Sequence, residues 1–380
     1  MSIYTTPLQF GYFFSLLLWI LLLIRGYKNQ RLSDKLLGWI MFILAMELQD
    51  YTFGFAGINF LWNELNGFPR SVSLLFGPIV YFYFLAQTNR SFVLKKTHLW
   101  HFLPYAAYFV YKLFFFLQGP ERVETLHQST LDLVMTYVLR ICLIVSFVYY
   151  LSKCSSIYRK YRKWSLDQFS NLELIDFKWF RNFIFSMIGW LVFREVMLVI
   201  DVIFKLDFYQ DWWWNLALAA VAIYIGLKGF SQKQPARISF DLDKVDDFIK
   251  HEPSVLPEKT VSTKSVDPEK VQIAKKLKEI MENDSLYLQP ELNLQELAQY
   301  LQTNPALLSA AINQVFGKNF NEYINGLRID EFVRKYNADS NHRFTLLSHA
   351  MDSGFNSKAT FNRAFKKIKG KSPQEFLKSH

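Results

Sequence analysis

The chain has 380 residues, 18% of them aromatic, and a formal net charge of +10. This length allows two domains, and most of the aromatic residues lie before residue 230. Cys142 and Cys154 form neither a disulfide framework nor the spacing of a metal site. The composition therefore excludes a small disulfide-stabilised domain and indicates two unlike parts, the first rich in apolar and aromatic residues.

Seven long apolar stretches in the first part predict membrane-spanning helices, each needing about 20 mostly apolar residues. Buried helices of a large soluble protein are the alternative, but the run from Phe13 to Ile24 has no polar face. The predicted spans are Pro7–Ile24, Leu36–Ala56, Val72–Thr88, Leu99–Leu117, Leu131–Ser152, Phe180–Phe204 and Trp212–Leu227.

Basic residues concentrate in alternate loops between these spans. The loop after the first span carries Arg25, Lys28, Arg31 and Lys35, whereas the next loop holds only Arg70. Cytoplasmic loops are enriched in Lys and Arg. The pattern therefore predicts an outside amino terminus and a cytoplasmic carboxy-terminal part, in a multi-pass protein of a lipid bilayer.

Several ionisable residues fall inside the predicted spans, where a charge is costly unless it is paired or faces a cavity. One hypothesis is a mixed-charge cavity, open to the outside, that binds a small polar or zwitterionic ligand. The other is a set of structural ion pairs that lock the bundle. The residues concerned are Glu47, Asp50, Lys112, Arg140, Arg194, Glu195 and Asp201. In the third span, Gly77-Pro78 indicates a kink or a close-packing point.

The apolar runs stop after residue 230. Prolines, serines and mixed charges predict a linker over 231–265 with at most one short helix, around Asp243–Lys250. The expected domains are therefore 1–230 in the membrane, the linker 231–265, and a helical domain at 266–380. Asp267-Pro268 starts that domain with a cap and a first-turn proline. Its expected helices are Glu269–Asn283, Leu294–Leu301, Pro305–Phe316, Phe320–Asn337, Thr345–Met351, Ser357–Ile368 and Pro373–Lys378.

A motif repeats at an offset of 53 residues inside this domain: Leu308 matches Phe361, and Gly317 matches Gly370. Each copy has a short helix, a turn and a second helix, as in a helix-turn-helix whose second helix enters the major groove of DNA. The second copy is basic, and Ala310 of the first stands where Arg363 stands in the second. We therefore expect the second copy to bind phosphates and the first to read bases through polar and methyl contacts.

Two segments carry a resemblance to a known family: Asn319–Asn325 and Gly354–Lys367. Residues from about 270 to 380 resemble the DNA-binding domain of the AraC/XylS family of transcription regulators. The resemblance implies a tandem helix-turn-helix that binds double-stranded promoter DNA. It places Ser357, Lys358, Thr360, Asn362 and Arg363 on the second recognition helix, beside Lys366 and Lys367, and Ala306, Leu307, Ser309, Ala310 and Asn313 on the first. Arg328 fits the family pattern, whereas His349 replaces an aliphatic residue.

The Leu75–Tyr83 stretch is similar to the multi-span membrane regions that some bacterial members of this family carry. This resemblance implies a location in the bacterial cytoplasmic (inner) membrane. Family analogy also implies a homodimer and contact with RNA polymerase, but it does not supply the ligand.

The expected fold class is all-α: a seven-helix transmembrane bundle followed by a cytoplasmic tandem helix-turn-helix domain. The sequence contains no phosphate loop, no His-Glu-x-x-His and no nucleophile elbow. A membrane enzyme that uses Glu47, Asp50 and Asp201 for acid/base work would not explain the repeated basic helices, so we expect no enzyme, no cofactor and no metal. The leading hypothesis is a membrane-bound one-component transcription regulator that responds to an unknown small-molecule or membrane signal. The alternative is a membrane receptor or transporter whose cytoplasmic helical domain binds a protein partner.

Overall fold

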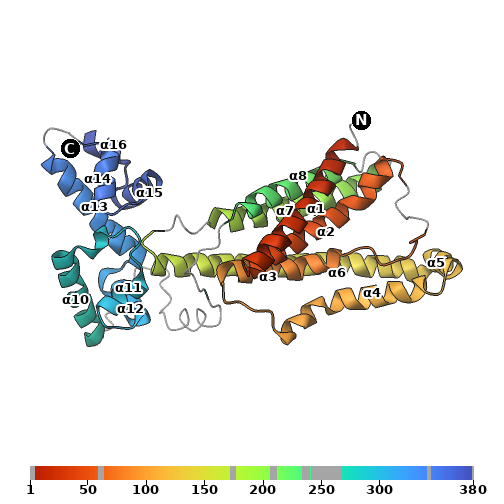
Figure 1. The fold of residues 1–380 in the computed structure, drawn as a ribbon, viewed down its shortest axis with the longest axis horizontal. Coiled ribbons are helices and arrows are strands. Elements are labelled where there is room, and N and C mark those ends of the chain that lie inside the picture. The colour runs from red at the N-terminus through yellow and green to blue at the C-terminus, as the bar shows by residue number, and fades with distance from the viewer. Residues whose placement is uncertain are drawn as a thin grey trace. The chain divides into compact units, whose positions relative to one another are not determined.

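A computed structural model describes residues 5–58, 64–171, 177–205, 212–232, 240, 267–339 and 344–378. In these ranges every named element is a helix, and one isolated β-bridge joins Phe169 to Asn293. The all-α fold is thus confirmed (Figure 1). The chain divides into two compact units. Unit 1 contains Met1–Tyr158 and Phe177–Phe240, and unit 2 contains Arg159–Asp176 and Asp241–His380.

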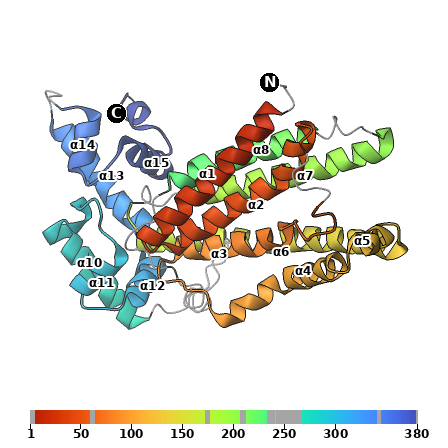
Figure 2. The ribbon, with the colours of Figure 1, turned by 45° about the vertical axis from the view of Figure 1, so that its right-hand side comes forward.

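Unit 1 is a helical bundle. Its central helices α1, α2 and α8 pack on one another, α7 packs on α8, and α3 packs on α2. Figure 2 shows α4 running along the side of this bundle, near α6. The helices are α1 (Thr6–Lys28), α2 (Leu32–Phe55), α3 (Phe76–Thr88), α4 (Leu103–Phe116), α5 (Pro120–His127), α6 (Thr130–Gln168), α7 (Phe177–Phe204) and α8 (Trp212–Phe230), with 3₁₀ turns at Ser73–Leu75 and Lys96–Phe102.

Five helices of the described ranges are long and apolar enough to cross a membrane: α1, α2, α6, α7 and α8. The third and fourth predicted spans form shorter helices, because α3 has 13 residues and α4 has 14. At 1.5 Å per residue each is about 20 Å long, less than the ~30 Å hydrocarbon core. A 3₁₀ turn takes up the first part of each predicted span. A membrane crossing by these two segments remains a prediction.

The Gly77-Pro78 pair is a close-packing point. A Cβ on Gly77 would lie only 2.5 Å from Cδ2 of Tyr150 on α6. Beside it, the Phe76 and Phe147 rings stack with their centroids 5.8 Å apart. The missing side chain therefore lets α3 approach α6 closely.

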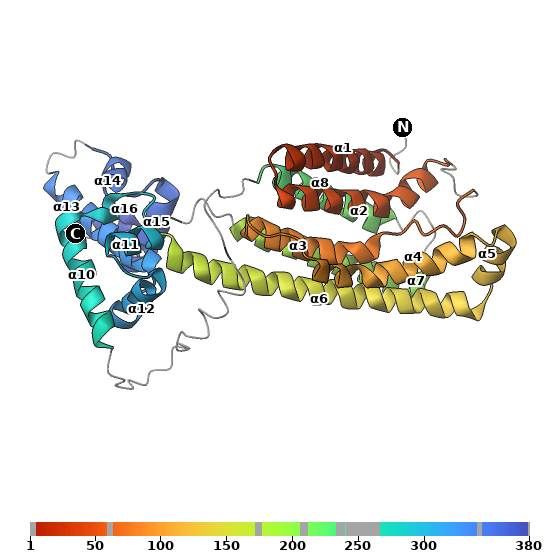
Figure 3. The same cartoon turned by 60° about the horizontal axis from the view of Figure 1, so that its bottom comes forward.

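The helix that differs most from prediction is α6, a single helix of 39 residues that continues to Gln168, past the expected end at Ser152 (Figure 3). It contains no glycine and no proline. Its residues up to Tyr158 belong to unit 1, and its residues from Arg159 belong to unit 2. The predicted span ended at Ser152 because the run of apolar residues stops there. The helix itself continues through the polar residues that follow.

Unit 2 contains seven α-helices in its described residues, each within two residues of its predicted ends. The predicted linker 231–265, with its helix at Asp243–Lys250, lies mostly outside the described residues. The helices are α10 (Pro268–Asp284), α11 (Leu294–Tyr300), α12 (Pro305–Phe316), α13 (Phe320–Ala338), α14 (Leu346–Asp352), α15 (Lys358–Lys369) and α16 (Pro373–Lys378), with a 3₁₀ turn at Leu286–Leu288.

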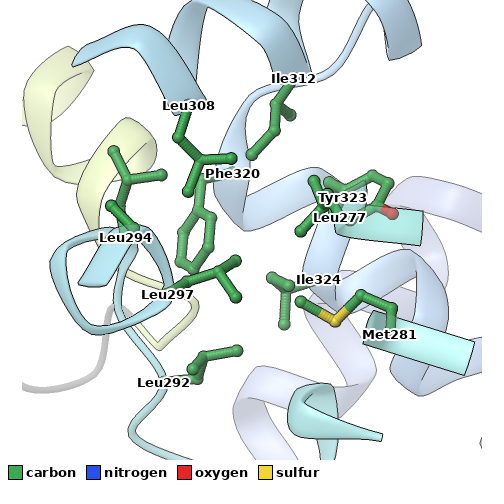
Figure 4. Packing of buried hydrophobic residues seen from close by; sticks show 11 residues of the cluster. Leu277, Met281, Leu292, Leu294, Leu297, Leu308, Ile312, Phe320, Tyr323 and Ile324 are labelled. Atoms are coloured by element: carbon green, nitrogen blue, oxygen red, sulfur yellow. The ribbon is translucent and has the colours of Figure 1, made fainter. Parts of the chain in front are cut away.

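Two separate hydrophobic cores stabilise the two halves of this unit. The first gathers Leu277, Leu297, Leu308 and Phe320 from α10 to α13 (Figure 4). The second is aromatic and gathers residues of α13 to α15: Ile329, Phe332, Ala350, Phe355, Phe361 and Phe365. The first part of α13 thus contributes to one core and a later part to the other. Leu308 and Phe361, which match in the repeat, are each buried in the core of their own copy.

Candidate nucleic-acid interface

The recognition helix of the second copy is α15, and its ends are fixed by the side chains that the sequence predicts. The Oγ atom of Ser357 accepts a hydrogen bond from the Thr360 N–H at 3.2 Å, which caps the first turn. Gly370 ends the helix with a φ of +75°, a conformation that costs glycine little. Between these caps, Phe361 and Phe365 are buried in the aromatic core.

The face of α15 opposite the core is polar, positive and exposed. It carries Lys358, Asn362, Arg363 and Lys366, whereas the side chain of Thr360 is buried under it. The Nε atom of Arg363 donates to the Ala359 carbonyl at 3.2 Å, along the helix surface. Side chains of this kind bind phosphates and the acceptor groups of guanine.

Two lysines of α15 have partners on α13. The Nζ atom of Lys367 lies 2.6 Å from a Glu322 carboxylate oxygen, and that of Lys369 lies 2.9 Å from Asp330. Burial raises the pKa of Glu322, but hydrogen bonds from Lys367 and from the Asn319 N–H hold it below its usual value overall. Lys367 therefore ties α15 to α13 here, and a phosphate contact by its ammonium group competes with that pair.

The recognition helix of the first copy, α12, has the same frame and a different surface. Asn304 caps it by accepting the Ala306 N–H at 2.7 Å, and Gly317 ends it with a φ of +62°. Of the predicted contact residues, Ala306 is exposed, Leu307, Ala310 and Asn313 are half-buried, and Ser309 is buried. No residue of α12 is charged. Any base reading by this helix depends on polar and methyl groups.

His349, which stands where the family pattern has an aliphatic residue, is buried. Its Nε2 atom lies 3.1 Å from a carboxylate oxygen of Asp339, and that same oxygen accepts the Phe344 N–H at 3.1 Å. The ring also contacts Tyr336 and Phe344 edge-on. The histidine in place of an aliphatic residue therefore packs like one, and it also connects the end of α13 to α14.

The comparisons with known proteins concern this part of the chain. Residues 297–379 match a family model described as a helix-turn-helix domain. This segment is an AraC-type helix-turn-helix domain. No curated protein and no solved structure matches the chain. The chain therefore carries the DNA-binding domain of a transcription regulator.

The helix-turn-helix domain contains one arginine that the resemblance named without a role, Arg328 on α13. Its side chain is 1% exposed and donates four hydrogen bonds, to the carbonyls of Tyr287 and Gln289, to the Asn325 side chain and to the Ser170 hydroxyl. Burial lowers the pKa of Arg328 to about 10, so the guanidinium is charged at neutral pH. Arg328 therefore holds the α10–α11 connection onto α13.

In unit 1, four of the predicted intramembrane charges form ion pairs. Arg140 and Arg194 both bind Glu195, at 3.3 Å and 2.6 Å. Lys112 binds Asp132, a partner that the sequence did not indicate, at 3.0 Å. These pairs fit the interpretation of structural locks.

Glu47 lines a cavity between α2, α3, α6 and α7. Arg194, Ser73, Ser146 and Trp190 line the same cavity. The Ser73 hydroxyl donates a short hydrogen bond to Glu47. The Trp190 indole nitrogen is buried and has no hydrogen-bond partner among the described residues. The cavity volume of about 40 Å³ accommodates roughly three water-sized groups. Asp50 and Asp201 are not among its lining residues.

Proposed function

We propose that this protein is a membrane-bound one-component transcription regulator whose carboxy-terminal domain binds promoter DNA in response to a signal received by unit 1. The observation that carries the proposal is the exposed row of Lys358, Asn362, Arg363 and Lys366 on a helix-turn-helix frame. The five apolar helices of unit 1 support a membrane location, and the alternation of loop charge supports a cytoplasmic DNA-binding domain.

The proposed partners are double-stranded promoter DNA, the lipid bilayer of the bacterial inner membrane and RNA polymerase, with the amino terminus outside the cell. The two helix-turn-helix copies differ in charge, and this difference affects how each would contact DNA. Cations on α15 supply affinity for phosphates, and α12 supplies uncharged groups for base edges. A homodimer would present two such pairs to two half-sites.

Replacing Arg363 with alanine tests the proposal. A duplex is first selected from a random DNA pool by the full chain in lipid nanodiscs. We expect Arg363→Ala to weaken binding of that duplex by about 10- to 150-fold, since a hydrogen bond between an arginine and a charged phosphate contributes about 1.5–3 kcal/mol. The measurement is a salt-dependent gel-shift titration.

Arg334→Ala is the matched control, because Arg334 is an exposed arginine of α13 that pairs with Glu331 at 2.7 Å. It should bind the selected duplex like the unmodified chain. Equal binding by the Arg363→Ala protein, or selection that yields no preferred sequence, would favour the alternative of a cytoplasmic domain that binds a protein partner.

The cavity around Glu47 is the proposed signal site of unit 1. Its lining combines a carboxylate, a guanidinium, two hydroxyls and an unpartnered indole N–H, against the stacked rings of Phe76 and Phe147. Of the described residues, none forms a salt bridge with Glu47, whereas Glu195 forms two. This difference supports a small polar or zwitterionic ligand, or a head group of that kind, at Glu47 and a structural role for Glu195.

The two carboxylates should respond oppositely to neutralisation. We expect Glu195→Gln to lower the melting temperature of the protein in nanodiscs, because it removes the carboxylate that pairs with both Arg140 and Arg194. We expect Glu47→Gln to leave the melting temperature equal or higher, since a carboxylate that faces a cavity destabilises the bundle in the absence of a ligand. A loss of stability in both variants would instead assign both carboxylates to locking the bundle.

A further inference from the structure

The segment that directly follows α6 is bound to α13 by side-chain amides. The Nδ2 atom of Asn321 donates to the carbonyls of Phe169 and Ser170, at 2.9 Å each. That of Asn325 donates to the Ser170 carbonyl at 3.1 Å. Asn321 and Asn325 are four residues apart on α13, so they lie on the same helix face. Three hydrogen bonds thus fix two consecutive backbone carbonyls of a segment that is remote in the sequence.

The side chain of Ser170 extends this contact into the core of the first helix-turn-helix. Its hydroxyl donates to the Leu292 carbonyl at 2.5 Å and accepts from the Arg328 guanidinium at 3.2 Å. Ser170 is 0% exposed. The β-bridge between Phe169 and Asn293 joins the same segment to the cap of α11. The contact is therefore buried, specific in geometry and satisfied on both sides.

The two recognition helices differ in how far they are covered. At the 53-residue offset, Ser309 of α12 corresponds to Asn362 of α15. Ser309 is 2% exposed, whereas the side chain of Asn362 is exposed. The Ser309 hydroxyl has no hydrogen-bond partner among the described residues. One predicted reading residue of α12 is thus buried, while the matching residue of α15 is open to solvent.

The last turns of α6 lie near α11 and α12. Figure 4 shows them in pale yellow-green beside the helices that carry Leu294 and Leu308. One side of these turns is itself buried: Tyr161 is 2%, Ser165 is 0% and Asp167 is 6% exposed. Residues 159–176 also cluster with the helix-turn-helix domain and not with unit 1. Covered side chains therefore lie both on α12 and on the end of α6.

We propose that residues 159–171 pack against the helix-turn-helix domain and cover Ser309, a reading residue of α12, until α6 is displaced. Because α6 has no glycine or proline along its 39 residues, a shift or rotation of its apolar part is transmitted to its last turns without a hinge. Release of the segment would expose Ser309 and its neighbours to DNA. What α12 then reads rests on the proposed function, but the covering contact does not.

Cysteine labelling of the full chain in nanodiscs tests the cover without DNA. In a Cys142→Ser, Cys154→Ala background, Ser309→Cys and the repeat-equivalent Asn362→Cys are each treated with a maleimide. We expect the cysteine at position 309 to react at least about tenfold more slowly, because a buried thiol reacts only after local opening. Adding Ser170→Ala with Asn321→Ala should accelerate labelling at 309 by about tenfold and leave 362 unchanged.

Two results of that experiment would overturn the proposal. One is equal labelling of the two positions before release. The other is slow labelling at 309 that persists after Ser170→Ala with Asn321→Ala, provided that circular dichroism shows the helices retained. In the second case, the helices of the helix-turn-helix domain alone would account for the burial of Ser309.

A reversible cross-link tests the consequence for DNA. Residues paired in an antiparallel bridge lie about 4.5–5.5 Å apart at Cα, which suits a disulfide, so Phe169→Cys with Asn293→Cys locks the segment in place. On the selected duplex, we expect oxidised full-length protein to bind at least about tenfold more weakly than reduced protein. Asn293→Cys alone should not respond to oxidation.

The outcomes keep the two proposals apart. Binding that is equal or tighter when the cross-link is closed would refute the covering role while leaving DNA binding intact. Failure of the reduced protein to bind any duplex would count against the proposed function. The labelling rates at positions 309 and 362 would still decide the cover.

Discussion

Replacing Arg328 with methionine is expected to destabilise the first helix-turn-helix by about 3 kcal/mol, more than any surface change in unit 2. Methionine fills a similar volume but donates no hydrogen bond. The carbonyls of Tyr287 and Gln289, each 2.6 Å from the guanidinium, would lose their donor, and so would the Ser170 hydroxyl. The relief from desolvating a buried cation offsets part of this loss.

Hydrogen exchange of the full chain, read at the amides of α11 to α13, measures the effect as a lower free energy of local opening. Arg334→Met is the control, because Arg334 is exposed and bound only through Glu331 among the described residues. It should change the same free energy by less than about 0.5 kcal/mol. Protection that survives Arg328→Met would mean that the arginine is dispensable for this connection.

Replacing Gly354 with alanine is expected to cost about 2–4 kcal/mol, from two sources that add. Gly354 has a φ of +91°, a conformation that costs a non-glycine residue about 1–2 kcal/mol. In addition, a Cβ there would lie 2.7 Å from the Tyr287 carbonyl oxygen and 2.9 Å from Leu288 Cα. These are backbone atoms, so they cannot move aside cheaply. The displaced oxygen is also the acceptor of Arg328.

Gly370→Ala separates the two sources. Gly370 also has a positive φ, +75°, but nothing lies within 4 Å of an added Cβ. It should therefore lose only the conformational part, about 1–2 kcal/mol, in denaturant unfolding monitored by hydrogen exchange. Equal losses for the two glycines would show that the contact with Tyr287 and Leu288 is not tight.

The helices of unit 2 could be predicted closely because their ends are set by local chemistry. Asp267 and Asn304 accept N–H groups in the first turns of α10 and α12, and Gly317 and Gly370 end the two recognition helices in the left-handed conformation. Each of these signals lies within a few residues of what it determines. The repeat of 53 residues then placed the two recognition helices in equivalent frames.

Features that depend on remote partners could not be predicted in this way. Lys367 belongs to a basic row in the sequence, and only the fold brings Glu322 to its ammonium group. Similarly, nothing near Ser170 indicates that it meets Arg328. One signal was present: Asn321, Asn325 and Arg328 form a polar stripe on a helix that otherwise contributes to two cores, and such a stripe predicts a polar partner. Hydropathy also predicted seven spans, whereas five helices of the described ranges have the full length.

The unequal charge of α12 and α15 has a consequence for how such a protein would use a signal. Cations attract every DNA sequence alike, whereas uncharged base contacts distinguish one sequence from another. If α12 alone is covered and uncovered, general attraction to the double helix through α15 changes little between the two states. What changes is discrimination. The signal would then govern which sites the protein prefers over random DNA, and the ratio of specific to non-specific affinity, measured in each state, is the quantity that reports it.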